Sequence, residues 1–293
     1  MNKENKIKLG ISGGSLKEPI KKLFKMNGYN FEINEAFSTV EIDDSDIEGF
    51  YARAKEIAPL ISKGVLDAGI VSRTAIAETD ANLEEVCDLG TANPVWEETN
   101  LVLAVQEESS VKSIKDLQGK KIITRAPEIT KKFLKKNGVD ALVEFSDGTN
   151  ESRLPDFADA IVEFTNTGAT FRFFGIRTLE ILMKDSLVLA ANRQTLADPQ
   201  KKEKIENLGL LLKGARVAQE HSGLMFHASN DMMEAVFKAA PALKRPTVTH
   251  LRGENWFDVF VVCKKKEIRR LVPDLKQIGC TDIVEFPLTK VVV

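Results

Sequence analysis

Residues 158–172 read ADAIVEFTNTGATFR and combine residue types that could bind a sugar phosphate. The apolar run 160–162 predicts a buried strand, and the carboxylate of Glu163 follows it directly. The polar run 165–170 contains Gly168 and predicts a turn that opens into a helix. Free N–H groups at a helix N-terminus bind anions, and threonine hydroxyls would add donors. A carboxylate beside such a turn can accept hydrogen bonds from sugar hydroxyls. The pattern points to a phosphoribosyl ligand, with ordinary threonine capping as the alternative.

A second candidate anion site follows the first predicted strand, at residues 6–12. The loop formed by Ser12, Gly13 and Gly14 leads into a segment with helical spacing over 16–27. Its N–H groups could meet an anion. Many α/β proteins begin with a strand, a loop and a helix, so a purely structural role stays open.

Three charged residues adjoin predicted strands. Arg53 follows a strand that ends at Ala52, and ligands of open α/β sheets bind at the carboxyl ends of strands. A guanidinium fork suits phosphate oxygens, although a surface ion pair would also explain Arg53. Asp67 and Asp159 are weaker candidates, because capping or structural carboxylates are common at such positions.

Composition limits what the rest of the chain can be. The 293 residues suffice for two or three domains, and 43% of them are hydrophobic, which supplies material for real cores. A formal charge of −2 argues against a nucleic-acid partner bound by bulk charge. Three widely spaced cysteines indicate reduced thiols in a cytoplasmic protein. No signal peptide is expected, because the N-terminal stretch has no apolar segment of that length, and no apolar run is long enough to span a membrane.

Predicted strands and helices alternate along the first two-thirds of the chain. A helix is expected over 54–63 and a strand over 66–71, and two strands over 83–105 flank a connection that contains Pro94. The basic segment 120–136 is interpreted as the solvated faces of helices. A long amphipathic helix is expected over 198–212.

The last 80 or so residues predict a β-α-β-β-α-β order, which is the ferredoxin-like pattern. Its first strand is expected over 217–226. The three histidines, His221, His227 and His250, lie here and have neither triad nor metal-ligand spacing. A small α+β unit placed after the other lobes suggests regulation or oligomerisation.

These residues resemble the ATP phosphoribosyltransferases that open histidine biosynthesis, in the long form with a C-terminal regulatory domain. DAIVEFTNTGATF resembles the family's phosphoribosyl-pyrophosphate loop, an acidic residue followed by a TGxT turn. Further resemblances follow in family order: Arg53 with ISKGVLDAGIVSR, DLQGKKIITRAPEITKKFLKKNGVD, and ALKRPTVTHL followed by a tryptophan. The resemblance extends over essentially the whole chain.

The chain departs from the family pattern at three places. Its first loop reads SGGSL, without the usual Lys or Arg, and Lys8 or Lys17 is a possible substitute for that cation. Ser72 stands where the family usually has glycine, and Glu163 stands where aspartate is commoner.

The resemblance implies that ATP reacts with 5-phosphoribosyl 1-pyrophosphate to give N1-(5-phosphoribosyl)-ATP and pyrophosphate. It implies Mg²⁺ carried by the substrate, with no protein metal ligands. Glu163 and Arg53 are the implied catalytic residues. The implied phosphoribosyl-pyrophosphate ligands are Glu163, Thr165, Asn166, Thr167, Gly168, Ala169 and Thr170. The implied ligands of ATP or pyrophosphate are Ser12, Gly13, Gly14, Arg53 and Asp67.

The implied fold is α/β, with a two-lobed core like type II periplasmic binding proteins and a ferredoxin-like (ACT/PII-like) C-terminal domain. The expected division is 1–95 with 185–212 for lobe I, 96–184 for lobe II, and 213–293 for the regulatory domain. Histidine is the implied inhibitor, at a region that contains Pro246, Thr247 and Thr249. Homodimers that assemble into hexamers are expected, with no nucleic acid or membrane partner.

Two alternative functions fit a two-lobed core of this kind. Prephenate dehydratases also join two lobes to a C-terminal regulatory unit, but they lack the acidic-TGxT loop. A cytoplasmic small-molecule-binding protein needs no catalytic residues, and the missing cation of the first loop favours it slightly.

Overall fold

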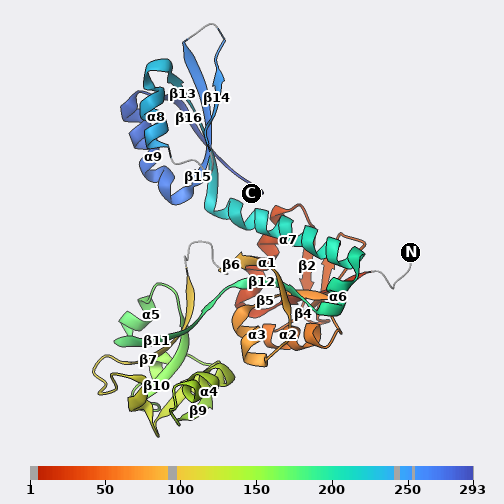
Figure 1. Ribbon diagram of the computed structural model, residues 1–293, viewed down its shortest axis with the longest axis vertical. Helices are drawn as coiled ribbons and strands as arrows, with labels where there is room; N and C mark the ends of the chain where they lie inside the picture. The colour runs from red at the N-terminus through yellow and green to blue at the C-terminus, as the bar shows by residue number, and fades with distance from the viewer. Residues whose placement is uncertain (1–5, 92–97, 241–244, 253–254, 293) are drawn as a thin grey trace. The chain divides into compact units, whose positions relative to one another are not determined.

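The computed structural model describes residues 6–91, 98–240, 245–252 and 255–292 (Figure 1). The chain divides into two compact units, Met1–Gly209 and Leu210–Val293. The first unit contains a seven-stranded and a five-stranded sheet, and the second contains a four-stranded sheet. We call these the first, second and third sheets. The expected α/β class is confirmed.

The first sheet has the order β2-β3-β4-β1-β5-β12-β6. Its strands are β1 (Ile7–Ser12), β2 (Phe31–Asn34), β3 (Thr39–Ile42), β4 (Ile47–Ala52), β5 (Ala68–Ser72), β6 (Glu84–Gly90) and β12 (Leu187–Ala191). Strand β1 runs parallel to β4 and β5, so the carboxyl ends of these three strands share one edge. Helices α1 (Lys17–Met26), α2 (Ala54–Ser62), α3 (Arg73–Thr79) and α6 (Arg193–Ala197) connect or follow them.

Two glycines allow α2 to pack closely on the first sheet. A Cβ atom on Gly10 of β1 would lie 2.6 Å from the side chain of Ile57, and one on Gly69 of β5 would lie 2.8 Å from Ile61. Both isoleucines are fully buried. Arg53 follows β4 and directly precedes α2, so its backbone lies at the strand-end edge.

The second sheet has the order β11-β7-β10-β8-β9. Its strands are β7 (Thr99–Gln106), β8 (Lys121–Thr124), β9 (Leu142–Phe145), β10 (Ala160–Thr165) and β11 (Ile176–Asp185). Strands β8, β9 and β10 are parallel, and β7 is antiparallel to β10. The helices are α4 (Pro127–Lys136) and α5 (Ala169–Phe173), with 3-10 turns at Ile114–Leu117 and Glu151–Arg153.

The chain passes between the first two sheets twice. It leaves the first sheet after β6 and returns between β11 and β12, where only Ser186 separates the two strands. The predicted connection around Pro94 lies outside the described residues. The return brings β12 between β5 and β6, where all five of its residues are buried.

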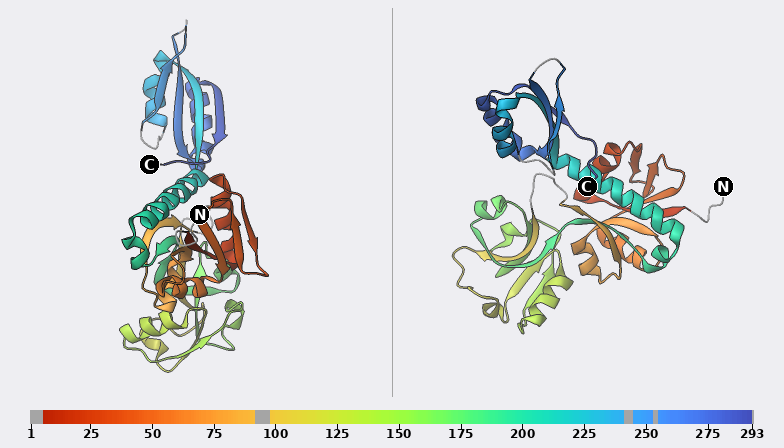
Figure 2. Two further views of the ribbon diagram at one scale, coloured as in Figure 1. Left: turned by 90° about the vertical axis from the view of Figure 1, so that its right-hand side faces the viewer. Right: turned by 45° about the horizontal axis from the view of Figure 1, so that its top comes forward.

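The second unit has the predicted β-α-β-β-α-β order, with sheet order β14-β15-β13-β16. Its elements are β13 (His221–Ser229), α8 (Met233–Ala239), β14 (Thr247–His250), β15 (Trp256–Lys264), α9 (Lys265–Ile278) and β16 (Thr281–Pro287). Helices α8 and α9 cover one face of this sheet (Figure 2). Leu224, Phe226 and Val261 lie in the core between them.

One predicted boundary is wrong. Residues 217–220, expected to begin a strand, are the last turn of helix α7 (Pro199–Glu220), and β13 begins at His221. The helix continues through Gly214, where it was expected to have ended. A glycine inside a helix costs only about 1 kcal/mol, so it does not by itself stop one.

Candidate substrate-binding site

The turn after β10 has the form that the sequence predicts. Strand β10 ends at Thr165, and Gly168 takes the left-handed conformation (φ 68°) as the residue that precedes α5. Thr167, Ala169 and Thr170 are exposed, so this turn is open to a ligand. Helix α5 has only five residues, so the turn and its hydroxyls, more than a helix dipole, would hold an anion.

Glu163 lies within β10 and is only 5% exposed. Its Oε2 accepts a hydrogen bond from Asn150 Nδ2 at 2.8 Å, and its Oε1 accepts one from the N–H of Phe164 at 2.9 Å. Burial raises the pKa of the Glu163 carboxyl, while these donors and the charge of Arg125 oppose the rise. The carboxylate is therefore fixed in direction before any ligand arrives.

Two residues that sequence reasoning missed connect Glu163 to Arg53. Arg125 follows β8, and its Nη1 lies 4.0 Å from Glu163 Oε1. The same guanidinium donates to Asp147 Oδ1 from Nε at 3.2 Å and from Nη2 at 3.0 Å. The other oxygen of Asp147 lies 3.7 Å from Nη1 of Arg53. The two implied catalytic residues thus meet through one arginine and one aspartate.

A sequence signal for Arg125 exists. Arg125 directly follows the predicted strand 121–124, just as Arg53 directly follows Ala52. Both positions are carboxyl ends of parallel strands, where ligands of α/β sheets bind. The interpretation of 120–136 as solvated helix faces hid this residue.

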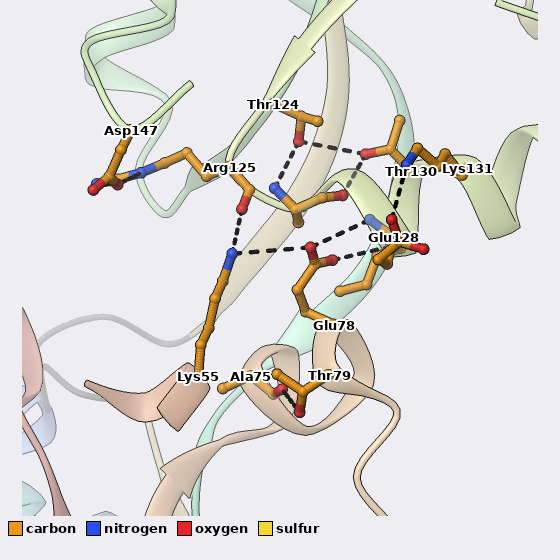
Figure 3. Close-up of polar contacts among 12 residues, drawn as sticks. Lys55, Ala75, Glu78, Thr79, Thr124, Arg125, Glu128, Thr130, Lys131 and Asp147 are labelled. Carbon is orange, nitrogen blue, oxygen red and sulfur yellow. Dashed lines mark hydrogen bonds and ion pairs between the residues drawn. The ribbon is translucent and has the colours of Figure 1, made fainter. Parts of the chain in front are cut away.

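A second set of contacts joins the first sheet's helices to the start of α4 (Figure 3). Glu78 of α3 is buried, and its carboxylate accepts hydrogen bonds from the N–H groups of Glu128 at 3.2 Å and Ile129 at 3.0 Å. Lys55 of α2 donates to the backbone oxygen of Arg125 at 2.6 Å. These contacts hold the backbone from which the Arg125 side chain extends.

The first loop offers fewer free donors than expected. The Ser12 hydroxyl is buried and donates to the backbone oxygen of Ile70 at 2.6 Å, and Gly13 N–H donates to Ala52 at 2.7 Å. A Cβ on Gly13 would lie 2.6 Å from the Tyr51 hydroxyl, so a larger residue there would displace the Tyr51 side chain. Gly14 has φ 67° and opens a 3-10 turn.

Neither substitute proposed for the missing cation is well placed. Lys17 is paired with Glu35 at 2.6 Å. Lys8 is the second residue of β1, whereas the loop follows the carboxyl end of that strand.

The structure places Asp67 apart from the other predicted site residues. This residue precedes β5, at the amino ends of the parallel strands. Its carboxylate accepts hydrogen bonds from the N–H of Lys8 at 2.8 Å, from Lys201 Nζ at 2.8 Å and from the Thr195 hydroxyl at 3.1 Å. Asp67 is a structural carboxylate on the edge opposite to Arg53.

Asp159 has the same kind of role in the second sheet. It precedes β10 and accepts hydrogen bonds from the N–H of Lys121 at 2.9 Å and from Lys120 Nζ at 3.0 Å. These contacts lower the pKa of the Asp159 carboxyl. They tie the amino ends of β8 and β10 together, away from Glu163.

A pocket of about 420 Å³ opens beside Glu163. It is lined by Arg125, Asp147, Gly148, Thr149, Glu151, Glu163 and Phe164. Within the described ranges, no three His, Cys, Asp or Glu side chains cluster as a metal site would require. The described residues also include no helix long and apolar enough to cross a membrane.

Comparison with known proteins decides the family. The sequence model of the family described as ATP phosphoribosyltransferase matches residues 53–214, and a model described as HisG, C-terminal domain, matches 218–290. The chain belongs to the ATP phosphoribosyltransferase family. It has the long form, and the expected family is confirmed.

Individual relatives agree over the full length. An ATP phosphoribosyltransferase of Chlorobium luteolum is 41% identical over 293 residues, with 100% of each chain covered. One from Pelotomaculum thermopropionicum is 37% identical over 287 residues, covering 98% of this chain and 99% of its own. A solved ATP phosphoribosyl transferase (HisG:HisZ) complex from Thermotoga maritima has a TM-score of 0.60 at 22% identity, covering 71% of this chain and 98% of its own.

Proposed function

We propose that this chain transfers the phosphoribosyl group of 5-phosphoribosyl 1-pyrophosphate to N1 of ATP. The observation that carries the proposal is the fixed carboxylate of Glu163, which lies beside an exposed TGxT turn and is linked through Arg125 and Asp147 to Arg53. Glu163 has the chemistry to bind a sugar, the TGxT turn a phosphate, and the arginines a pyrophosphate. This chemistry favours a transferase over a simple binding protein.

The turn and the carboxylate would hold the two ends of the ribose phosphate. We assign the 5′-phosphate to the segment 167–170, through backbone N–H groups and the hydroxyls of Thr167 and Thr170. Thr165 and Asn166 would support it at the end of β10. Glu163 would accept hydrogen bonds from the ribose hydroxyls. Because the donors on Glu163 already fix its direction, little reorganisation is needed on binding.

The reaction asks for positioning and for stabilisation of charge on the leaving group. Adenine N1 forms a bond to the anomeric carbon of ribose as the bond from that carbon to pyrophosphate breaks, and the bonding electrons leave with pyrophosphate. Arg53 would stabilise the leaving charge, and Gly14 with the first loop would meet phosphates of ATP. Mg²⁺ would enter bound to substrate phosphates and neutralise part of their charge.

The second unit would carry regulation. Thr247 and Thr249 lie on the exposed edge strand β14, and Pro246 directly precedes it. We propose that histidine binds in this region as a feedback inhibitor and that homodimers assemble into hexamers. Activity and oligomer size that stay unchanged when histidine is added would contradict this proposal.

We further propose the division 1–95 with 185–212, 96–184 and 213–293 for the two lobes and the regulatory domain. A cytoplasmic location fits the three cysteines, none of which forms a disulfide in the described part of the chain.

The catalytic assignment is tested by following phosphoribosyl-ATP formation from ATP, phosphoribosyl pyrophosphate and Mg²⁺. Thr170→Ala should raise the KM for phosphoribosyl pyrophosphate about tenfold, because a hydrogen bond to a charged phosphate is lost. Thr178→Ala is the matched control, since Thr178 is an exposed threonine on β11 of the same sheet. Equal kinetic constants for both variants would contradict the phosphate assignment.

A further inference from the structure

Two guanidinium groups from distant segments hold one carboxylate. Arg53 follows β4 of the first sheet and Arg125 follows β8 of the second, and Asp147 lies between them. Asp147 Oδ1 faces Arg125 at 3.0 Å and Oδ2 faces Arg53 at 3.7 Å. Arg125 keeps the pKa of the Asp147 carboxyl below its usual range, with a smaller contribution from Arg53. Two guanidinium groups that face one carboxylate have the chemistry to face another anion in its place.

The place of this anion site relative to Glu163 indicates its ligand. In phosphoribosyl pyrophosphate, the carbon that carries pyrophosphate is bonded to the carbon that carries the 2-hydroxyl. A carboxylate that binds this hydroxyl must therefore lie close to the pyrophosphate. Arg125 Nη1 is 4.0 Å from Glu163 Oε1, and both residues line the same pocket. A diphosphate carries several oxygens in the geometry that arginine forks match.

The Asp147 carboxylate is an occupant that a diphosphate could replace. The side chains of Arg125 and Asp147 are 44% and 53% exposed, and ion pairs at such exposure contribute little to stability. The first loop, by contrast, has no cation of its own, and Lys17 is engaged by Glu35. Arg125, which faces the same carboxylate as Arg53, is therefore placed to complement it.

We infer that Arg125 binds the pyrophosphate group of the substrate together with Arg53, and that the Asp147 carboxylate occupies the place of this group until substrate binds. The inference rests on the proposed role of Glu163 in ribose binding. Arg125, which follows a strand of the second sheet, would then supply the second positive charge that stabilises the leaving pyrophosphate. It would replace the cation that the first loop lacks.

The test titrates inorganic pyrophosphate, with Mg²⁺ and at fixed ionic strength, into the full chain. Arg125→Ala should weaken pyrophosphate binding about tenfold or more, because charge-assisted hydrogen bonds are lost. Its backbone oxygen, which accepts from Lys55, remains in this variant. Arg125→Lys keeps the positive charge but lacks the guanidinium fork. Its pyrophosphate affinity should therefore lie between that of the unchanged chain and that of Arg125→Ala. Unchanged pyrophosphate affinity in Arg125→Ala would overturn the inference.

Lys121→Ala is the matched control. Lys121 lies at the amino end of the same strand, pairs with Glu144 at 2.9 Å, and carries the same charge. It should change pyrophosphate affinity by less than about twofold. If both variants lose pyrophosphate affinity equally, the effect of Arg125 comes from its overall charge and not from direct binding, which would contradict the inference.

Asp147→Asn tests whether Asp147 only occupies the pyrophosphate position or also holds the arginines while pyrophosphate is bound. Removal of the competing charge should leave pyrophosphate binding as tight as before or tighter. Weaker binding in this variant would show that Asp147 must hold the arginines while the ligand is bound, and would overturn the placeholder role.

Glu163→Ala distinguishes failure of this inference from failure of the proposed ribose site. It should not weaken binding of inorganic pyrophosphate, which has no ribose, but it should raise the KM for phosphoribosyl pyrophosphate. If Glu163→Ala raises that KM and Arg125→Ala leaves pyrophosphate binding unchanged, only the inference fails. If Glu163→Ala leaves the KM unchanged, the ribose assignment fails.

Discussion

Asn150 has no exposed surface, and its amide donates to Glu163 at 2.8 Å. Its Oδ1 atom is buried and has no hydrogen-bond partner among the described residues. A buried amide that satisfies only its donor side costs free energy, which is common where a residue serves function. The contact gives Glu163 a fixed direction and favours its charged form. Asn150 thus belongs to the site although it need not touch the substrate.

Asn150→Ala should lower kcat/KM for phosphoribosyl pyrophosphate about tenfold at neutral pH, because a hydrogen bond to a charged group is lost. The pH profile gives a second readout. Glu163 must be ionised to accept from ribose, and burial already raises its pKa, so activity falls as pH falls through this raised value. Loss of the Asn150 donor raises the pKa further. The acidic limb should therefore move to higher pH.

A double-mutant comparison shows whether Asn150 acts through Glu163. In a Glu163→Ala background, Asn150→Ala should cause no further loss of kcat/KM. Ser152→Ala, in the 3-10 turn that Asn150 precedes but exposed, serves as the control. Losses that simply add, or an unmoved acidic limb, would assign Asn150 to the packing of the loop alone.

At the scale of elements, Glu78 couples α3 to α4. Helix α4 begins with Pro127 after Ala126, whose side chain cannot cap it, and its next two N–H groups are satisfied by Glu78 from another element. A carboxylate at a helix N-terminus is favoured by the free N–H groups and by the helix dipole. This cap fixes the segment that carries Arg125.

Glu78→Ala should reduce the free energy of unfolding by about 1–2 kcal/mol, because two buried N–H groups lose their acceptor. Glu128→Gln is the control, since Glu128 is 53% exposed and its ion-pair partner among the described residues is Lys131 in its own helix. That change should stay within about 0.5 kcal/mol. Denaturant unfolding of both variants measures the difference, and equal stabilities would contradict the capping role.

At the scale of the whole molecule, local signals in the sequence were reliable. The buried strand and the glycine turn at 160–168 depend on adjacent residues, and the structure has them where the pattern predicts. The ferredoxin-like order was also predictable, because hydrophobic periodicity defines each element. The end of α7, expected at Leu212, was not, because the helix continues through Gly214 at a cost of only about 1 kcal/mol.

Contacts between distant segments were the part that sequence could not supply. Asn150 reaches Glu163 from the loop before β10, and Glu78 reaches α4 across 50 residues. No local pattern marks such pairs. Asp67 illustrates a further limit, because a carboxylate next to a predicted strand can lie at either end of the sheet. The structure places it at the amino end, away from the site.

The most direct test of the central claim compares the two substrates in Glu163→Ala. The account predicts that the KM for phosphoribosyl pyrophosphate rises about tenfold or more, because the ribose of this substrate loses a hydrogen-bond acceptor. The KM for ATP should change by less than about twofold. An unchanged KM for phosphoribosyl pyrophosphate, in a variant that folds and turns over normally, would contradict the account.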